Sequence, residues 1–311
     1  MTEFHHVSVL LEECLEGLNI KPDGVYVDGT LGGAGHSSQI VRRLTTGRLI
    51  GIDRDPVALK AAGERLAPYA DRVTLVHSNF CEMDRVLDDL GIEGVDGILL
   101  DLGVSSPQLD EVSRGFSYMG DAPLDMRMNH EDSLTADVVV NTWSQEELKR
   151  ILYDYGEERY APQIAAAICR RREAAPIKTT LELVDVIRSA MPPAALREKQ
   201  HPAKRSFQAI RIAVNDELGA VQQVLDAAIP KLNPGGRLAI ITFHSLEDRI
   251  VKNGMADAAK GCTCPPNFPV CVCGKKPKVK IITRKPVVSG DEELDRNPRA
   301  RSAKLRVCEK L

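Results

Sequence analysis

Short β-rich runs alternate with helical stretches between residues 25 and 103, and this alternation constrains the fold more than any other feature of the sequence. The segments 37–44, 57–66 and 83–90 carry apolar residues at helical spacing. The β-rich runs around them are VYVD (25–28), RLIGID (48–53), VTLVHS (73–78) and GILLDLG (97–103). Such a repeat predicts an α/β fold in which helices cover both faces of a parallel sheet, with ligands at the carboxyl ends of the strands.

The pattern changes after about residue 110, because residues 135–190 are almost purely helical in period. A Pro-bounded linker at 192–202 and a long helix over 206–232 then lead to the strand RLAIITF at 237–243. We therefore predict a discontinuous α/β domain, residues 1–110 and 205–311, interrupted by a helical insertion at 111–204 that serves substrate recognition.

Two local signals refine this prediction. SQEEL at 144–148 is typical of a capping box that opens an amphipathic helix. In the tail, KVKIIT (278–283) and AKLRVCE (303–309) suit an antiparallel pair of strands that closes the sheet.

The composition is that of a globular protein, with 43% hydrophobic and 27% charged residues and no run of about 18 apolar residues to cross a bilayer. The first 17 residues hold four Glu and no positive region before their apolar stretch, unlike a secretory signal. Several of the eight cysteines stand alone in apolar stretches, which fits free thiols in a reducing compartment. We expect a protein of the cytoplasm without a membrane partner.

Charge is distributed unevenly along the chain. The net charge of -3 argues against a general nucleic-acid binder. Residues 275–311, however, hold 12 Lys and Arg against 5 Asp and Glu, a net charge of +7, while the rest of the chain carries -10. A polyanion would therefore meet the C-terminal part, although a solvated basic tail accounts for the charge equally well.

A glycine-rich loop, VDGTLGGAGH (27–36), follows the first β-rich run and lets the backbone approach a ligand closely. Its spacing is not G-x-G-x-x-G and it lacks the Lys-Ser/Thr of a P-loop, so a phosphate site is poorly supported. Asp53 ends the second run, about 20 residues after the loop, where a carboxylate accepts both hydrogen bonds of a ribose diol. Loop and acid together predict an adenosine-type cofactor, unless the loop is a turn without a ligand.

The next two runs end in further candidate residues. Asn79 and Phe80 follow the third run, where they could flank an adenine ring, but Phe80 could equally be a core residue. The fourth run leads into DLGVSSPQLD (101–110).

Together these strings resemble the RsmH family, also called MraW, of bacterial 16S rRNA (cytosine-N4)-methyltransferases. The resemblance runs in order from His6 to about Val307. The strings that carry it are VDGTLGGAGHS, IDRDP, GILLDLGVSSPQLD, RGFSY with PLDMRM, YGEERYA, TFHSLEDRIVK and NPRARS. It implies a Rossmann-like class I methyltransferase sheet with an inserted helical domain, and S-adenosyl-L-methionine as cofactor.

The resemblance also implies roles for individual residues and a substrate. The implied substrate is N4 of a specific cytidine at the decoding region of 16S rRNA, within the small ribosomal subunit. A homodimer is among the oligomeric states that the sequence leaves open. The implied cofactor-binding residues are Ala34, Gly35, His36, Asp53, Phe80, Asp101 and Gln108.

Asp101 is also our candidate catalytic residue. The cytosine amino group is a weak nucleophile, so a hydrogen-bond acceptor for its protons would assist methyl transfer. In DNA amino-methyltransferases the corresponding loop holds an acidic or polar residue, two prolines and an aromatic. DLGVSSPQ lacks that aromatic, so their mechanism is not carried over directly.

Four residues are candidates for contact with RNA. His244 and Arg249 follow the fifth strand, where they could shape the cytidine pocket or cap the next helix. Arg299 and Arg301 lie two residues apart and would project the same way if extended, which suits phosphate contacts, or they are solvated charges.

The cysteines at 262, 264, 271 and 273 form two C-x-C pairs around a Pro-rich turn. Four thiolates could hold zinc tetrahedrally, but the usual spacing is C-x2-C, and free thiols or a partial disulfide are the alternative. From this spacing we assign no metal ligand.

Three other functions share parts of this pattern: a DNA amino-methyltransferase, an NAD-linked oxidoreductase, and an RNA-binding assembly factor that only retains the cofactor fold. The altered loop after the fourth strand disfavours the first. Calorimetric titrations with S-adenosylmethionine and with NAD would distinguish the oxidoreductase from a methyltransferase. Methyl incorporation into ribosomal subunits would distinguish the assembly factor from an active enzyme.

Overall fold

The computed structural model describes residues 8–262, 264, 270 and 273–311. It divides into two compact units, Met1–Gly103 with Leu218–Leu311, and Val104–Glu217. The sequence-based boundaries differ from these by 7 to 13 residues. The largest difference arises because helix α11 (Lys204–Asn215) contributes Phe207 and Ile210 to the core of the second unit.

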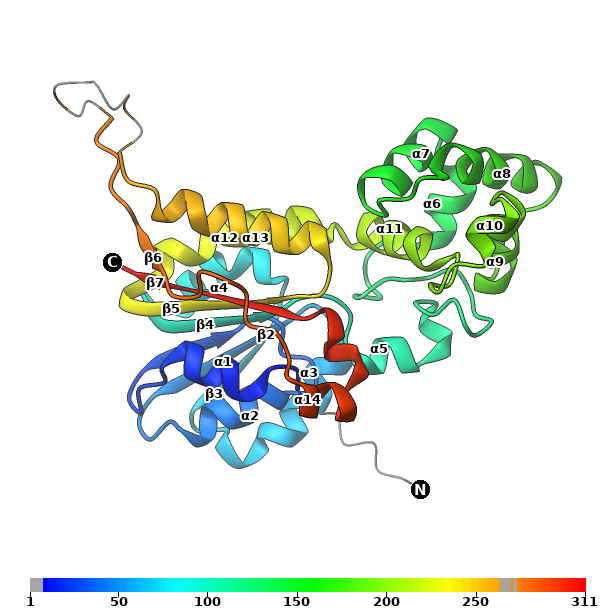
Figure 1. The fold of residues 1–311 in the computed structure, drawn as a ribbon. Helices are drawn as coiled ribbons and strands as arrows, with labels where there is room; N and C mark the ends of the chain where they lie inside the picture. Colours follow the sequence, from blue (N-terminus) through cyan, green and yellow to red (C-terminus); the bar gives the residue numbers. More distant parts are fainter. Residues whose placement is uncertain (1–7, 263, 265–269, 271–272) are drawn as a thin grey trace. The chain divides into compact units, whose positions relative to one another are not determined.

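The first unit contains a seven-stranded sheet of order β3-β2-β1-β4-β5-β7-β6 (Figure 1). Strands β1 to β5 run parallel, and β7 is antiparallel to both of its neighbours. This confirms the predicted α/β sheet and its antiparallel closing pair. The strands are β1 (Val25–Asp28), β2 (Arg48–Asp53), β3 (Val73–His77), β4 (Val95–Asp101), β5 (Leu232–Thr242), β6 (Val279–Ile281) and β7 (Lys304–Lys310).

Helices cover both faces of this sheet, as Figure 1 shows. One apolar core lies against α1 (Leu11–Leu18), α2 (Gly35–Arg42) and α3 (Pro56–Leu66). The other lies against α4 (Met83–Asp89), α12 (Glu217–Lys231) and α13 (Ser245–Ala259). Successive strand residues alternate between the cores, so the central strands are apolar on both faces. The short helices η1 (Ala67–Tyr69), η2 (Phe80–Glu82), α14 (Asp291–Arg296) and η4 (Pro298–Ser302) complete this unit.

The second unit is helical and has its own core. Ser144 opens α7 with the predicted capping box, since its side chain accepts from the Glu147 amide while Glu147 accepts from the Ser144 amide. The helices of this unit besides α11 are α5 (Ser106–Asp110), η3 (Val112–Arg114), α6 (Ala136–Thr142), α7 (Gln145–Asp154), α8 (Ala161–Ala174), α9 (Thr180–Ser189) and α10 (Pro193–Leu196).

The predicted single helix over 206–232 is wrong, because α11 and α12 are separate helices joined at Asp216. Asp216 has a left-handed conformation with φ of 48°. The buried Asn215 side chain donates to the Met126 carbonyl at 2.8 Å and accepts from the Met128 amide at 2.8 Å. Contacts to a distant segment thus accompany the break, and the local helical period does not reveal them.

None of the helices in the described part of the chain is both long enough and apolar enough to span a membrane.

Candidate cofactor site

The glycine-rich loop after β1 is fastened across the carboxyl edge of the sheet. The Gly29 amide donates to the Leu99 carbonyl of β4 at 2.9 Å, and the Leu31 amide donates to the Ile52 carbonyl of β2 at 3.1 Å. Ala34 ends the loop in the left-handed region, with φ of 56°, and forms the N-cap of α2. The loop therefore bridges both strands beside β1, at the point where the strand order reverses and α/β proteins bind ligands.

The glycines of this loop meet two different environments. A Cβ atom on Gly29 would lie 2.5 Å from the Leu100 side chain and 3.1 Å from both Met83 and Phe80. A Cβ atom on Gly33 would meet no protein atom within 4 Å. Gly29 is therefore required by packing, whereas the exposed Gly33 borders open space where a ligand can approach the backbone.

Replacing Gly29 with Ala should lower the free energy of unfolding by about 1–3 kcal/mol, because the added methyl group overpacks the core. Urea unfolding of the cofactor-free protein measures this change. Gly33→Ala is the matched control and should stay within about 0.5 kcal/mol of the wild type. Equal stabilities of the two variants would contradict this packing role of Gly29.

Asp53 ends β2 beside the loop. One of its carboxylate oxygens accepts from the Gly32 amide at 2.7 Å and the other from the Asp55 amide at 2.8 Å. Burial raises the pKa of Asp53 to about 6, against the effect of these hydrogen bonds. Each oxygen keeps a second lone pair, so the carboxylate is held in place and can still accept from a ribose diol.

Asp28 and Asp101 end β1 and β4, which are neighbours in the sheet. Asp28 accepts from the Ser37 hydroxyl at 2.7 Å and from the Thr30 amide at 3.2 Å, and burial raises its pKa to about 6. Burial, reinforced by the charges of Asp28 and Glu247, raises the pKa of Asp101 to about 8. The buried Oδ1 of Asp101 has no hydrogen-bond partner within the described structure. Asp101 is thus the polar group of the site that most needs a ligand.

His36 lies in the first turn of α2 and is buried. Its Nε2 is 3.0 Å from the Val9 carbonyl oxygen, and its Nδ1 is 3.8 Å from Oδ2 of Asp101. Neutral histidine with a proton on Nε2 donates to that carbonyl and leaves Nδ1 as an acceptor. This hydrogen bond fixes the orientation of the His36 ring beside Asp101.

Phe80 follows β3 at the start of η2, where the Asn79 side chain accepts from the Cys81 amide at 3.3 Å. Phe80 is half-buried and packs partly against the core that includes Met83. The core alternative for Phe80 thus holds in part, and its contact with an adenine ring stays a prediction.

The electrostatics of the site fit S-adenosylmethionine. Among the described ion pairs, none joins a Lys or Arg to Asp28, Asp53 or Asp101. Three carboxyl groups with raised pKa values favour a ligand that brings positive charge, as a sulfonium and an ammonium do. Asp53 adds an acceptor for a ribose, and the absence of a P-loop suits a cofactor without phosphate.

Sequence analysis missed Asp28, Thr30 and Ser37 at this site. The Thr30 hydroxyl accepts from the Asp101 amide at 2.6 Å, which ties the glycine loop to the end of β4. Ser37 supplies the hydroxyl that anchors Asp28. The signal that could have found them is their position, since Asp28 and Thr30 lie inside the glycine-rich string and Ser37 lies directly after it.

Gln108 belongs to the second unit. Its side chain and that of Ser105 form a capping box at the start of α5, with the Ser105 amide donating to Gln108 at 3.1 Å. Gln108 is buried in this position. Its contact with the cofactor stays a prediction.

His244 is the N-cap of α13, which agrees with the capping alternative. Its Nδ1 accepts from the Glu247 amide at 3.4 Å, while the Glu247 carboxylate accepts from the His244 amide at 3.2 Å. Arg249 is exposed on the same helix. Asp248 binds Arg306 at 2.6 Å and Lys304 at 3.3 Å, and these cations lower its pKa although burial acts the other way.

Arg299 and Arg301 are exposed, but they lie on the 3-10 helix η4 and not on extended backbone. The expectation that the two side chains project the same way required an extended backbone, and η4 is not extended. Residues two apart on such a helix point in different directions, because each residue turns the chain by about 120°. Both side chains are exposed to solvent.

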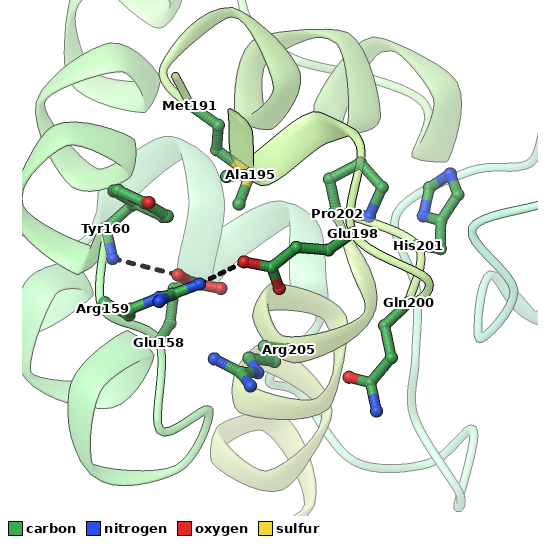
Figure 2. Close-up of a pocket in the computed structure, with 10 residues that line it drawn as sticks. All are labelled: Glu158, Arg159, Tyr160, Met191, Ala195, Glu198, Gln200, His201, Pro202 and Arg205. Carbon is green, nitrogen blue, oxygen red and sulfur yellow. Dashed lines mark hydrogen bonds and ion pairs between the residues drawn. The ribbon is translucent and has the colours of Figure 1, made fainter. Parts of the chain in front are cut away.

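The second unit has a hollow between α8, α10 and α11 that is lined by charges of both signs (Figure 2). Arg159 and Glu198 form an ion pair in it, and Arg205 lies on the α11 side. Near its edge, His201 stacks on Tyr118 with ring centroids 4.6 Å apart. Burial and the charge of Arg188 lower the pKa of His201, which favours the neutral ring.

Comparison with known proteins gives a consistent result over the whole chain. Residues 3–311 match the MraW methylase family. The chain is 60% identical over 310 residues to the ribosomal RNA small subunit methyltransferase H of Heliobacterium modesticaldum, covering 99% of both chains. It is also 60% identical over 309 residues to the protein of the same name from Brevibacillus brevis, covering 99% of this chain and 98% of that protein.

Among solved structures, an rRNA methylase from Streptococcus thermophilus is similar with a TM-score of 0.41 and 12% identity, covering 98% of this chain and 99% of the other. The chain belongs to the MraW methylase family and is an S-adenosylmethionine-dependent methyltransferase.

Proposed function

We propose that the protein transfers a methyl group from S-adenosylmethionine to N4 of a specific cytidine of 16S rRNA, at the decoding region of the small ribosomal subunit. The structural observation that carries the methyl-donor part is the set of carboxyl groups at the ends of β1, β2 and β4, without an Arg or Lys in a described ion pair. The relatives named as small subunit rRNA methyltransferases support the substrate. In this proposal, the methylation reaction takes place in the bacterial cytoplasm.

In this proposal, residues of the first unit contact different parts of the cofactor. Asp53 accepts from the ribose hydroxyls and Phe80 lies against the base. The backbone of Ala34 and Gly35, with His36 and Asp101, holds the methionine end. When bound, the cofactor supplies an activated methyl group on a positively charged sulfur.

The protein then has to orient the acceptor nitrogen, exclude water and take up one proton. Asp101 is our candidate for the proton, because its buried Oδ1 has no hydrogen-bond partner in the described structure. A carboxyl group with a pKa of about 8 is a stronger base than an ordinary aspartate, which suits this task near neutral pH.

The function is tested with small subunits from a strain that lacks the gene. The purified protein and S-adenosylmethionine are added, and fragments of the 16S rRNA are analysed by mass spectrometry. One added methyl on a single decoding-region cytidine, at N4 by comparison with a synthetic standard, is the expected result. Naked rRNA and double-stranded DNA serve as parallel substrates. Methylation of DNA alone, or of no nucleic acid, would contradict the proposal.

RNA phosphates should be held by the basic C-terminal region, since the chain as a whole is acidic. Changing Arg299 and Arg301 together to Ala should weaken subunit binding, and the slope of log affinity against log salt should flatten by about one to two units. Cofactor affinity should not change. Filter binding at several salt concentrations measures the slope.

The matched control removes the same charge elsewhere on the first unit. Arg42 and Arg43 are exposed at the end of α2, and their double Ala variant should keep the wild-type slope. If both double variants behave alike, the two arginines of η4 do not contact phosphate. His244 and Arg249 are the remaining RNA candidates of the first unit, and the helical insertion would then carry more of the recognition.

A further inference from the structure

Three cysteine thiols lie together in the segment between α13 and β6. The Sγ atoms of Cys262, Cys264 and Cys273 all lie within 4.8 Å of one another. The Sγ atoms of Cys262 and Cys273 are 3.7 Å apart, and the Cys264 amide donates to the Cys262 sulfur at 3.4 Å. Cys271 lies outside the described residues. We propose that this cluster binds a structural zinc ion.

The distances fit zinc better than the alternatives. A zinc–sulfur bond is about 2.3 Å long, so two thiolates at corners of a tetrahedron around zinc lie about 3.8 Å apart. A disulfide requires sulfur atoms about 2.05 Å apart, and Cys262 and Cys273 are well beyond that. The Sγ atoms of Cys262 and Cys273 thus have the spacing of two such corners, and Sγ of Cys264 lies within 4.8 Å of both.

The two ends of the segment are held by the fold. The Lys278 amide donates to the Ala258 carbonyl at 2.8 Å, and Ala258, Ala259 and Val279 pack on the core beneath α12. Cys262 and Cys273 are exposed and Cys264 is half-exposed, so burial of apolar surface contributes little to holding them together. A metal cross-link would supply that stability in its place.

The charges around the cluster also suit bound zinc. Several thiolates around one divalent cation leave net negative charge on the site. Lys260, Lys275, Lys276 and Lys278 are exposed on either side of the cluster and offset that charge. Zinc would thus fix a short segment that presents lysines at the start of the basic tail, independently of the cofactor site.

The test measures metal on the full-length protein. Protein purified under reducing conditions should contain about one equivalent of zinc by mass spectrometry of the metal. After removal of zinc, cobalt(II) should give the visible absorption bands of a tetrahedral thiolate site. Cys262→Ser and Cys273→Ser should each lose bound zinc and these bands at least tenfold. Cys169→Ala, in α8 of the second unit, is the control and should keep both.

S-adenosylmethionine binding is measured on every variant and shows that each has folded. Zinc loss in a variant that still binds the cofactor supports the site. The proposal is overturned if folded wild-type protein holds less than a tenth of an equivalent after incubation with zinc and gives no cobalt bands. It is equally overturned if mass spectrometry finds a disulfide among these cysteines in the reduced preparation, or if the serine variants bind zinc as tightly as the wild type.

Discussion

Asp101→Asn should lower kcat/KM for S-adenosylmethionine by about 100-fold. The variant keeps the size of the side chain but removes a negative charge from a buried site that receives a cation. Losing one partner of such a buried charged contact costs about 2–5 kcal/mol. Initial rates of methyl incorporation at varied cofactor concentration measure the change.

The split between kcat and KM separates the two roles of Asp101. As a proton acceptor, Asp101 predicts that kcat also falls at saturating cofactor, since general-base catalysis contributes about 100-fold or more. A loss confined to KM would leave Asp101 as a cofactor residue and exclude it as the base. Cofactor binding measured directly by calorimetry provides the equilibrium value for comparison.

The pKa of Asp101 gives this prediction a pH dependence with a definite sign. Burial first, then Asp28 and Glu247, raise the pKa to about 8, so the free site is largely protonated at neutral pH. Affinity for the cationic cofactor should rise as the pH increases through about 8, and binding at pH 7 should release protons. In Asp101→Asn the affinity should no longer follow this titration, so the ratio of wild-type to variant affinity should grow from pH 6 to pH 9.

Stability of the cofactor-free protein should respond in the opposite direction. A carboxyl group with a raised pKa in the folded state binds its proton more tightly there than in the unfolded chain. Its stabilising contribution is complete below about pH 4 and is lost as the pH rises towards 8. Asp101→Asn lacks this contribution, so its melting temperature relative to the wild type should increase over that range.

Asp53→Ala should weaken S-adenosylmethionine binding by about 1–3 kcal/mol, or about 5- to 150-fold. The variant removes the carboxylate that accepts from the ribose in our proposal, and it also removes the acceptor of the Gly32 and Asp55 amides. Calorimetric titration measures the affinity. Asp53→Asn retains one carbonyl oxygen and should lie between the wild type and the Ala variant.

The control for Asp53 is Asp89→Ala, which removes a carboxylate from an exposed position at the end of α4. It should bind the cofactor as the wild type does. Unchanged affinity in Asp53→Ala would remove Asp53 from the ribose site, whatever its effect on the loop.

The sequence determined the parts of this protein that depend on local pattern. The strands from Val25–Asp28 to Val95–Asp101 were predictable because buried parallel strands are short apolar runs separated by helical periods. Asp53 and Asp101 could be grouped before any coordinates, because the carboxyl ends of parallel strands meet at one edge of a sheet. The strings of the glycine loop and of its neighbours were sufficient to indicate the family.

Tertiary contacts decided the rest. The break at Asp216 accompanies hydrogen bonds from Asn215 to residues almost 90 positions away, and the His244 ring proved to be a helix cap. The raised pKa of Asp101 depends on burial beside Asp28 and Glu247, which lie on other strands and helices. Periodicity and spacing describe neighbours along the chain, whereas burial and charge coupling arise between segments that folding brings together.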